Sequence, residues 1–232
     1  MKTRTMLFCA ASVLTGFIAN AQGSTQIRGG VNFANVSINE NGRVDKANQL
    51  TSFQVGIIGN LPLGSDAISL QPGLLFTGKG SKVEKGIAGQ TGYFKQTFNP
   101  MYIEVPLNVV LKTDLGSTTK FFVGAGPYIA AGVAGKVKTE GSHLLTGNYS
   151  YDSDIRFSND DPTTLNQEEG TGLGVVRRFD YGLNGTAGIE GKTTVVGVNY
   201  GLGLAKLQSG SNSNTDNNNK NRVISVTLGF KL

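Results

Sequence analysis

The chain has 232 residues, of which 38% are hydrophobic and 16% charged, with a formal net charge of +5 and one cysteine. A single cysteine excludes a disulfide-stapled mini-protein, and so mild a positive charge does not indicate nucleic-acid binding. The 33 glycines show no collagen-like period, so they need another explanation.

The N-terminus is typical of a cleaved secretory signal peptide. Lys2 and Arg4 precede an uncharged apolar stretch over 6–19, and the small-x-small triplet Ala19-Asn20-Ala21 follows it. A retained membrane helix would need about 20 apolar residues. We therefore predict a signal peptide at 1–21 and one domain at 22–232. Without Lys2, Arg4 and Cys9, the domain carries 19 Lys and Arg against 16 Asp and Glu and has no cysteine for catalysis or metal binding.

After this leader, hydrophobic residues recur at every second position, which is the period of a β-strand with one apolar face. In the segment VVGVNYGLGL, for example, Val196 and Val198 share one face while Gly197 and Asn199 share the other. The pattern predicts eight strands, at 26–34, 52–61, 68–77, 101–111, 121–135, 179–190, 195–204 and 223–232.

The connections between these segments alternate in length. The short ones are PLGSD, TDLGST and GKT, and the long polar ones lie at about 36–50, 78–92, 136–172 and 206–220. Antiparallel strands in up-and-down order would place every long loop at one end and every short turn at the other.

The polar face indicates which solvent the apolar face meets. A soluble lipocalin-like barrel turns its apolar face inward around a ligand, whereas an outer-membrane barrel turns it outward to lipid. Here the polar face is rich in Gly, Asn, Gln, Ser and Thr, while a soluble exterior would carry dense Lys and Glu. Small residues also suit a narrow lumen. We therefore predict an all-β, eight-stranded antiparallel transmembrane barrel, a meander in an outer membrane with both termini on the periplasmic side.

Closure of the barrel explains the last ten residues, VISVTLGFKL. An unpaired backbone amide in lipid costs several kcal/mol, so segment 223–232 must pair with the first strand. Pro72, Pro106 and Pro127 fall inside predicted strands, where proline removes a hydrogen bond, and we expect bulges or a position near a rim there.

Six segments stand out as motifs in chain order: IRGGVNFANV, LQPGLLFTGKGSK with its Lys79-Gly80 pair, YIEVPLNV, GPYIAAGVAGK, FDYGLNGTAGIE and YGLGLAKL. Together they resemble the PorT-like group of small outer-membrane barrels abundant in Bacteroidota. That resemblance implies an eight-stranded membrane barrel but no single activity, and a subset of the group is associated with secretion machinery.

Three charges fall on the polar face of predicted strands and would lie in the lumen. These are Arg28, Glu104 and Asp180. A charge in a narrow barrel must be paired or hydrated, so the simplest interpretation is an ion pair that rigidifies the barrel. A gate or proton path is the alternative, although packed eight-stranded barrels rarely conduct.

The longest predicted loop, 136–172, is acidic. Asp152, Asp154, Asp160 and Asp161 could bind a cation such as calcium through their carboxylates, but no EF-hand spacing is present, so a solvated acidic loop is the default. The length of this loop makes it the expected surface for other envelope proteins.

The sequence gives little support for an enzymatic function. His143 is the only histidine, and no nucleophile or ligand spacing surrounds it, so we predict neither a serine triad nor a zinc site, and no cofactor. The function predicted is a structural, adhesive or envelope-assembly role, with a small-solute channel, a soluble ligand-binding barrel and a barrel hydrolase as alternatives in that order.

Overall fold

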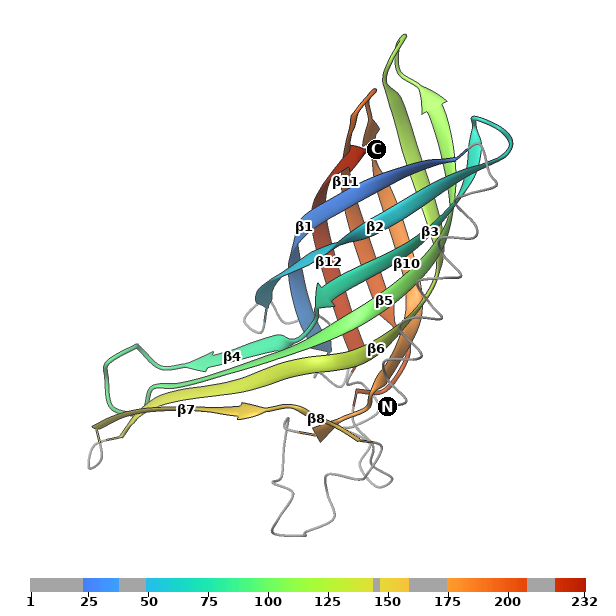
Figure 1. Ribbon diagram of the computed structural model, residues 1–232. Helices are drawn as coiled ribbons and strands as arrows, with labels where there is room; N and C mark the ends of the chain where they lie inside the picture. Colours follow the sequence, from blue (N-terminus) through green and yellow to red (C-terminus); the bar gives the residue numbers. More distant parts are fainter. Residues whose placement is uncertain (1–22, 38–48, 144–146, 159–174, 208–219) are drawn as a thin grey trace.

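The computed structural model describes residues 23–37, 49–143, 147–158, 175–207 and 220–232, so the leader 1–21 lies outside the described residues. Eight long strands form a closed ring in up-and-down order (Figure 1), as the period-2 pattern predicted. They are β1 Ser24–Ser37, β2 Leu50–Ser65, β3 Ile68–Gly78, β5 Phe94–Asp114, β6 Lys120–His143, β10 Phe179–Glu190, β11 Thr194–Gly203 and β12 Lys220–Lys231. In the described chain no helix is long and apolar enough to cross a membrane.

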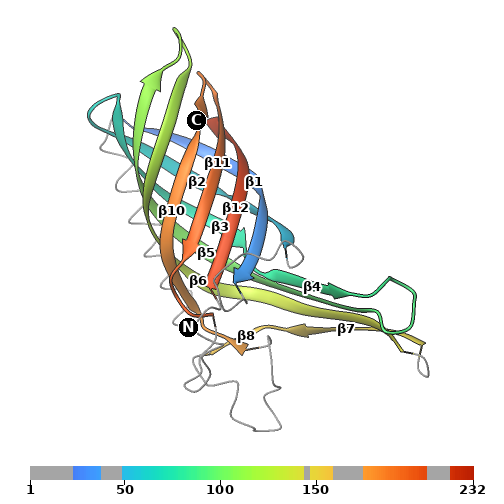
Figure 2. The same cartoon turned by 180° about the vertical axis from the view of Figure 1, so that it is seen from behind.

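The ring closes between its first and last strands. β1 pairs antiparallel with β12 in one continuous register, from Gln26 opposite Lys231 to Ser37 opposite Lys220. Figure 2, seen from the side opposite to Figure 1, shows β10, β11 and β12 in the front wall of the barrel, with β2 and β3 behind them. The predicted role of the final segment as the closing strand is therefore confirmed.

The two ends of the barrel differ as predicted. The three short turns, at 66–67, 115–119 and 191–193, lie at the same end as Leu232, and the longer connections lie at the other end (Figure 1). Outer-membrane barrels have short periplasmic turns and longer extracellular loops. We call these the turn end and the loop end.

Side chains alternate between lipid and lumen along every wall strand. Phe53, Val198 and Phe230 are about half exposed on the outside, whereas Gln54 and Glu104 are buried inside. A soluble carrier would require the opposite arrangement. The outward belt continues around the ring and includes Ile27, Val31, Val55, Leu107, Val109, Val123, Ile129, Leu183, Val196, Ile224, Val226 and Leu228.

Two predicted long loops are in part β-structure, which corrects the sequence analysis. β5 begins at Phe94 instead of Met101, and β6 continues to His143. Two further strands flank them, β4 Ser81–Lys85 and β7 Gly147–Asp154. The prediction failed because the apolar alternation stops at the membrane boundary while the backbone pairing continues beyond it.

The prolines do not create the bulges expected at them. The β3–β5 ladder keeps one register across Pro72 and Pro106, and Pro127 stands in register opposite Leu183 of β10. The register shifts fall elsewhere, between Pro62 and Ser65 and between Met101 and Tyr102. Instead, each proline interrupts one ladder without shifting it. The pairs 59/72 and 60/71, 73/106 and 74/105, and 107/127 and 108/126 are missing, and the same register resumes beyond each gap.

An apolar plug closes the loop end of the lumen. Ile155 and Phe157 pack against inward side chains of the wall. Phe157 ends the short strand β8 Arg156–Phe157, which pairs in parallel with β9 Val175–Val176. Gly132 makes room for this packing, because a Cβ there would overlap the Phe157 ring. The other members of the plug are Val36, Phe98, Val137, Val176 and Leu207.

The lipid-facing belt can be tested with a matched pair of substitutions. Ile129 on the belt and Ile87 in the β4–β5 connection are each 65% exposed, so they differ mainly in the solvent they meet. We expect Ile129→Arg to lower the free energy of unfolding in lipid vesicles by about 2–4 kcal/mol, the cost of a mid-bilayer arginine, and Ile87→Arg to change it little. Urea titration followed by gel mobility measures both. Equal effects would contradict the assignment of lipid to this face.

Candidate functional site

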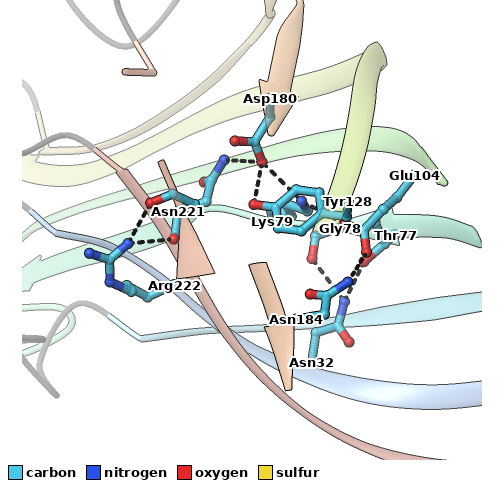
Figure 3. A network of polar contacts seen from close by, with 11 residues as sticks. Asn32, Thr77, Gly78, Lys79, Glu104, Tyr128, Asp180, Asn184, Asn221 and Arg222 are labelled. Atoms are coloured by element: carbon cyan, nitrogen blue, oxygen red, sulfur yellow. Dashed lines mark hydrogen bonds and ion pairs between the residues drawn. The ribbon is translucent and has the colours of Figure 1, made fainter. Parts of the chain in front are cut away.

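The lumen contains a buried charge cluster near its loop end. Lys79 follows the last residue of β3 and is 3% exposed. Its Nζ lies 2.7 Å from Oε2 of Glu104 on β5 and 2.9 Å from Oδ2 of Asp180 on β10. One lysine therefore bridges two carboxylates from different strands (Figure 3).

Tyrosine and asparagine side chains complete this cluster. Tyr128 of β6 donates its hydroxyl to Oδ2 of Asp180 at 3.1 Å, and its ring centroid lies 4.1 Å from the Lys79 Nζ. Asn221 of β12 donates to the same oxygen at 3.1 Å, while Asn184 of β10 donates to Oε1 of Glu104 at 3.3 Å. We call these six residues the lumenal cluster: Lys79, Glu104, Tyr128, Asp180, Asn184 and Asn221.

The lumenal cluster joins strands that are not neighbours in the ring. Its members lie on β5, β6, β10 and β12, with two of them on β10, and Lys79 directly follows β3, so its contacts cross the lumen. A buried charge stripped of water costs several kcal/mol unless it is paired and hydrogen-bonded. With the apolar plug above it, the cluster connects strands across the lumen near the loop end.

Arg28, Glu104 and Asp180 all lie inside the barrel, each less than 10% exposed, but they do not form one group. Glu104 and Asp180 share Lys79, whereas the Nε and Nη2 atoms of Arg28 have no hydrogen-bond partner among the described residues. Sequence reasoning noted Lys79 only within a family motif, because it comes after the last residue of the alternating run.

A second charge group lies at the turn end. Glu190 of β10 accepts from Nζ of Lys112 at 2.7 Å and from Nζ of Lys231 at 2.6 Å. Beside it, Val110, Phe122 and Val195 form a small buried apolar cluster. Both ends of the lumen are thus filled by side chains.

Beyond the loop end, four strands continue outside the barrel as one sheet. We define the projecting sheet as β4, residues 94–99 of β5, residues 136–143 of β6, and β7, paired in that order. Figure 1 shows it leaving the barrel to one side, and its two edge strands, β4 and β7, pair with no other strand of the described chain.

The outer face of these strands changes from apolar to charged where the sheet leaves the membrane. Met101 pairs with Ala134, and two residues further out Asn99 pairs with Lys136. The face that carries the apolar belt in the barrel therefore becomes charged, with Lys82, Lys95, Lys136, Lys138, Glu84, Glu140, Asp152 and Asp154. This transition marks the outer boundary of the hydrocarbon layer.

The described part of the predicted acidic loop places its carboxylates beside lysines. Asp152 and Asp154 stand opposite Lys138 and Lys136, while Glu140 lies 2.9 Å from the Lys138 Nζ. That hydrogen bond lowers the pKa of the Glu140 carboxyl, and its exposure keeps the contribution to stability small. In the ranges that the structure describes, no three His, Cys, Asp or Glu residues gather to hold a metal. Asp160 and Asp161 lie outside those ranges, and His143 ends β6 opposite Gly147.

The opposite face of the projecting sheet is aromatic. Tyr149 and Tyr151 of β7 are both exposed, and their rings lie nearly parallel with centroids 6.3 Å apart. The Tyr149 ring covers Gly141 of β6, which places both tyrosines on the face that continues the lumen wall. Every residue of β7 is exposed, so this strand presents a free edge beside the tyrosine pair.

The bridging role of Lys79 can be measured by removing its charge. We expect Lys79→Met to lower the free energy of unfolding by about 3–5 kcal/mol, because Glu104 and Asp180 are left buried without a cation. The control is Lys79→Met combined with Glu104→Gln and Asp180→Asn, which removes all three charges and should recover most of the loss. Urea unfolding in vesicles compares the two. A single variant as stable as the unaltered protein would contradict the assigned role.

The chain is similar to several solved structures at low sequence identity. Ail of Yersinia pestis, solved with the heparin analogue sucrose octasulfate, is 14% identical, with 90% of this chain and 99% of that chain covered and a TM-score of 0.41. Neisserial surface protein A is 12% identical, with 90% and 97% covered and a TM-score of 0.45. The N-terminal barrel domain of Pseudomonas aeruginosa OprF is 10% identical, with 91% and 100% covered and a TM-score of 0.33.

No curated protein matches the chain. The family described as "Outer membrane protein beta-barrel domain" matches residues 20–209, which is most of the sequence. That match agrees with the closed ring and its lipid-facing belt, and the chain belongs to the outer membrane protein β-barrel domain family and is located in the outer membrane.

Proposed function

We propose that this protein is a non-conducting, non-enzymatic outer-membrane anchor that holds the projecting sheet outside the cell as a binding surface for another protein. The observation that carries the proposal is the continuation of paired β-structure past the membrane boundary. Apart from Phe98 and Val137, which belong to the apolar plug, residues 81–99 and 136–154 neither cross the lipid nor close the lumen, yet the greater part of them is hydrogen-bonded into a sheet.

The filled lumen supports the anchoring role. Phe98, Tyr102 and Phe122 are almost completely buried between the strands, and the lumenal cluster lies between the plug and the turn-end charges. Eight-stranded barrels are just wide enough for side chains to fill. A protein of this kind contributes a fixed platform and leaves recognition to the parts outside the membrane.

The composition of the projecting sheet supports protein recognition. Tyrosine supplies a large contact area at low cost in side-chain entropy and is enriched at binding interfaces. Next to Tyr149 and Tyr151, the exposed edge of β7 offers backbone donors and acceptors that an extended segment can pair with. Adhesion to an external protein and assembly with another envelope protein would both use this surface.

Conductance tests the closed lumen. We expect the purified protein in planar bilayers to show no single-channel steps above the background, because side chains occupy the lumen at both ends. An unrelated open porin incorporated in the same way controls for insertion. Reproducible steps that scale with protein concentration would support the small-solute channel instead.

Substitution of the tyrosine pair tests the binding surface. We expect Tyr149→Ser with Tyr151→Ser to weaken attachment of producing cells to immobilised extracellular and envelope proteins by about 10–100-fold, because each exposed aromatic anchor contributes on the order of 1 kcal/mol or more. The control, Ser150→Ala with Asp152→Ser, changes the opposite face of the same strand. A bound-cell assay with folded protein verified by heat-modifiable mobility measures both. Attachment lost in the control but kept in the tyrosine variant would place binding elsewhere.

A further inference from the structure

Arg28 is a buried cation that forms no ion pair with a carboxylate of the described residues. It lies on β1 between Gly56 of β2 and Gly229 of β12, which leave room for its side chain to extend into the lumen. The residue is 6% exposed, and its Nε and Nη2 atoms have no hydrogen-bond partner among the described residues. A guanidinium group carries five N–H donors, and these two atoms account for three of them.

The carboxylates of the lumen are engaged with other cations. Glu190 is the carboxylate that acts electrostatically on Arg28, but it already accepts from Lys112 and Lys231 at 2.7 and 2.6 Å. Glu104 and Asp180 hold Lys79. The described lumen therefore contains four cationic side chains and three carboxylates, namely Arg28, Lys79, Lys112 and Lys231 against Glu104, Asp180 and Glu190.

A cavity with a mixed lining adjoins Arg28. It has a volume of about 40 Å³ and is lined by apolar side chains such as Ile58 and Leu75, by Lys79 and Glu104 of the lumenal cluster, and by polar groups around Arg28, namely Gln54, Asn108, Asn199 and Ser225. One water needs about 10–15 Å³ of such volume, so the cavity holds roughly three water-sized groups. A monatomic halide with one or two waters fits that space.

We propose that the lumen binds one chloride-sized anion beside Arg28. The guanidinium supplies the charge, and the amide and hydroxyl groups of Gln54, Asn108 and Ser225 can donate hydrogen bonds to the same space. The anion balances the excess positive charge of the lumen at Arg28, the cation that is not paired with a described carboxylate. This binding site is independent of the projecting sheet and of its partner.

Bromide locates the anion directly. Crystals of the full chain soaked in sodium bromide should show an anomalous peak within hydrogen-bonding distance of the Arg28 guanidinium, and crystals of Arg28→Gln should lack it while other peaks remain. The control Lys192→Gln, at an exposed position in the β10–β11 turn, should keep the lumenal peak. Bromide found only at surface lysines would overturn the proposal.

Thermal unfolding gives a second readout. At equal ionic strength, we expect the unaltered protein to unfold about 3 °C or more higher in sodium chloride than in sodium gluconate, since a ligand bound only to the folded state raises Tm. Arg28→Gln should unfold at one temperature in both salts, and Arg28→Lys, which keeps the charge, should retain part of the difference. A chloride effect of the same size in Arg28→Gln, or no effect in the unaltered protein, would overturn the site.

Discussion

The requirement that every backbone amide in lipid has a hydrogen-bond partner determines the rest of this structure. Hydrocarbon offers no water to an exposed strand edge, so the sheet must close on itself. The continuous β1–β12 register provides that closure, and it fixes which side chains point outward. Once the ring is closed, the two-residue period gives lipid one set of side chains and the lumen the other.

Closure of the ring also encloses a lumen, and buried charged side chains occupy much of it. An eight-stranded ring encloses a narrow space that polar side chains must fill. Lys79 lies between Glu104 and Asp180, and Lys112 and Lys231 flank Glu190. These two groups connect strands across the barrel at different heights. Because charged contacts in a space of low polarity are strong only when complete, each group is held by hydrogen bonds as well as by charge.

Outside the membrane the same strands meet a different solvent, and their surface changes accordingly. Beyond Met101 and Ala134 the outer face turns from apolar to charged, while the inner face, no longer enclosed, presents Tyr149 and Tyr151. The backbone pairing does not change across this boundary. A single sheet thus serves as a membrane wall at one end and as an exposed recognition surface at the other.

The sequence by itself determined the eight wall strands, their up-and-down order and the outward direction of residues such as Phe53 and Val198, because the alternation is a local property with a fixed two-residue period. It also placed Glu104 and Asp180 on the polar face. Only the tertiary structure decided that Lys79 bridges them, that Arg28 lies apart, and that Asp152 and Asp154 face lysines on a strand. Those facts depend on which residues meet across the ring and beyond the membrane boundary, and contacts between distant strands leave no local period in the sequence.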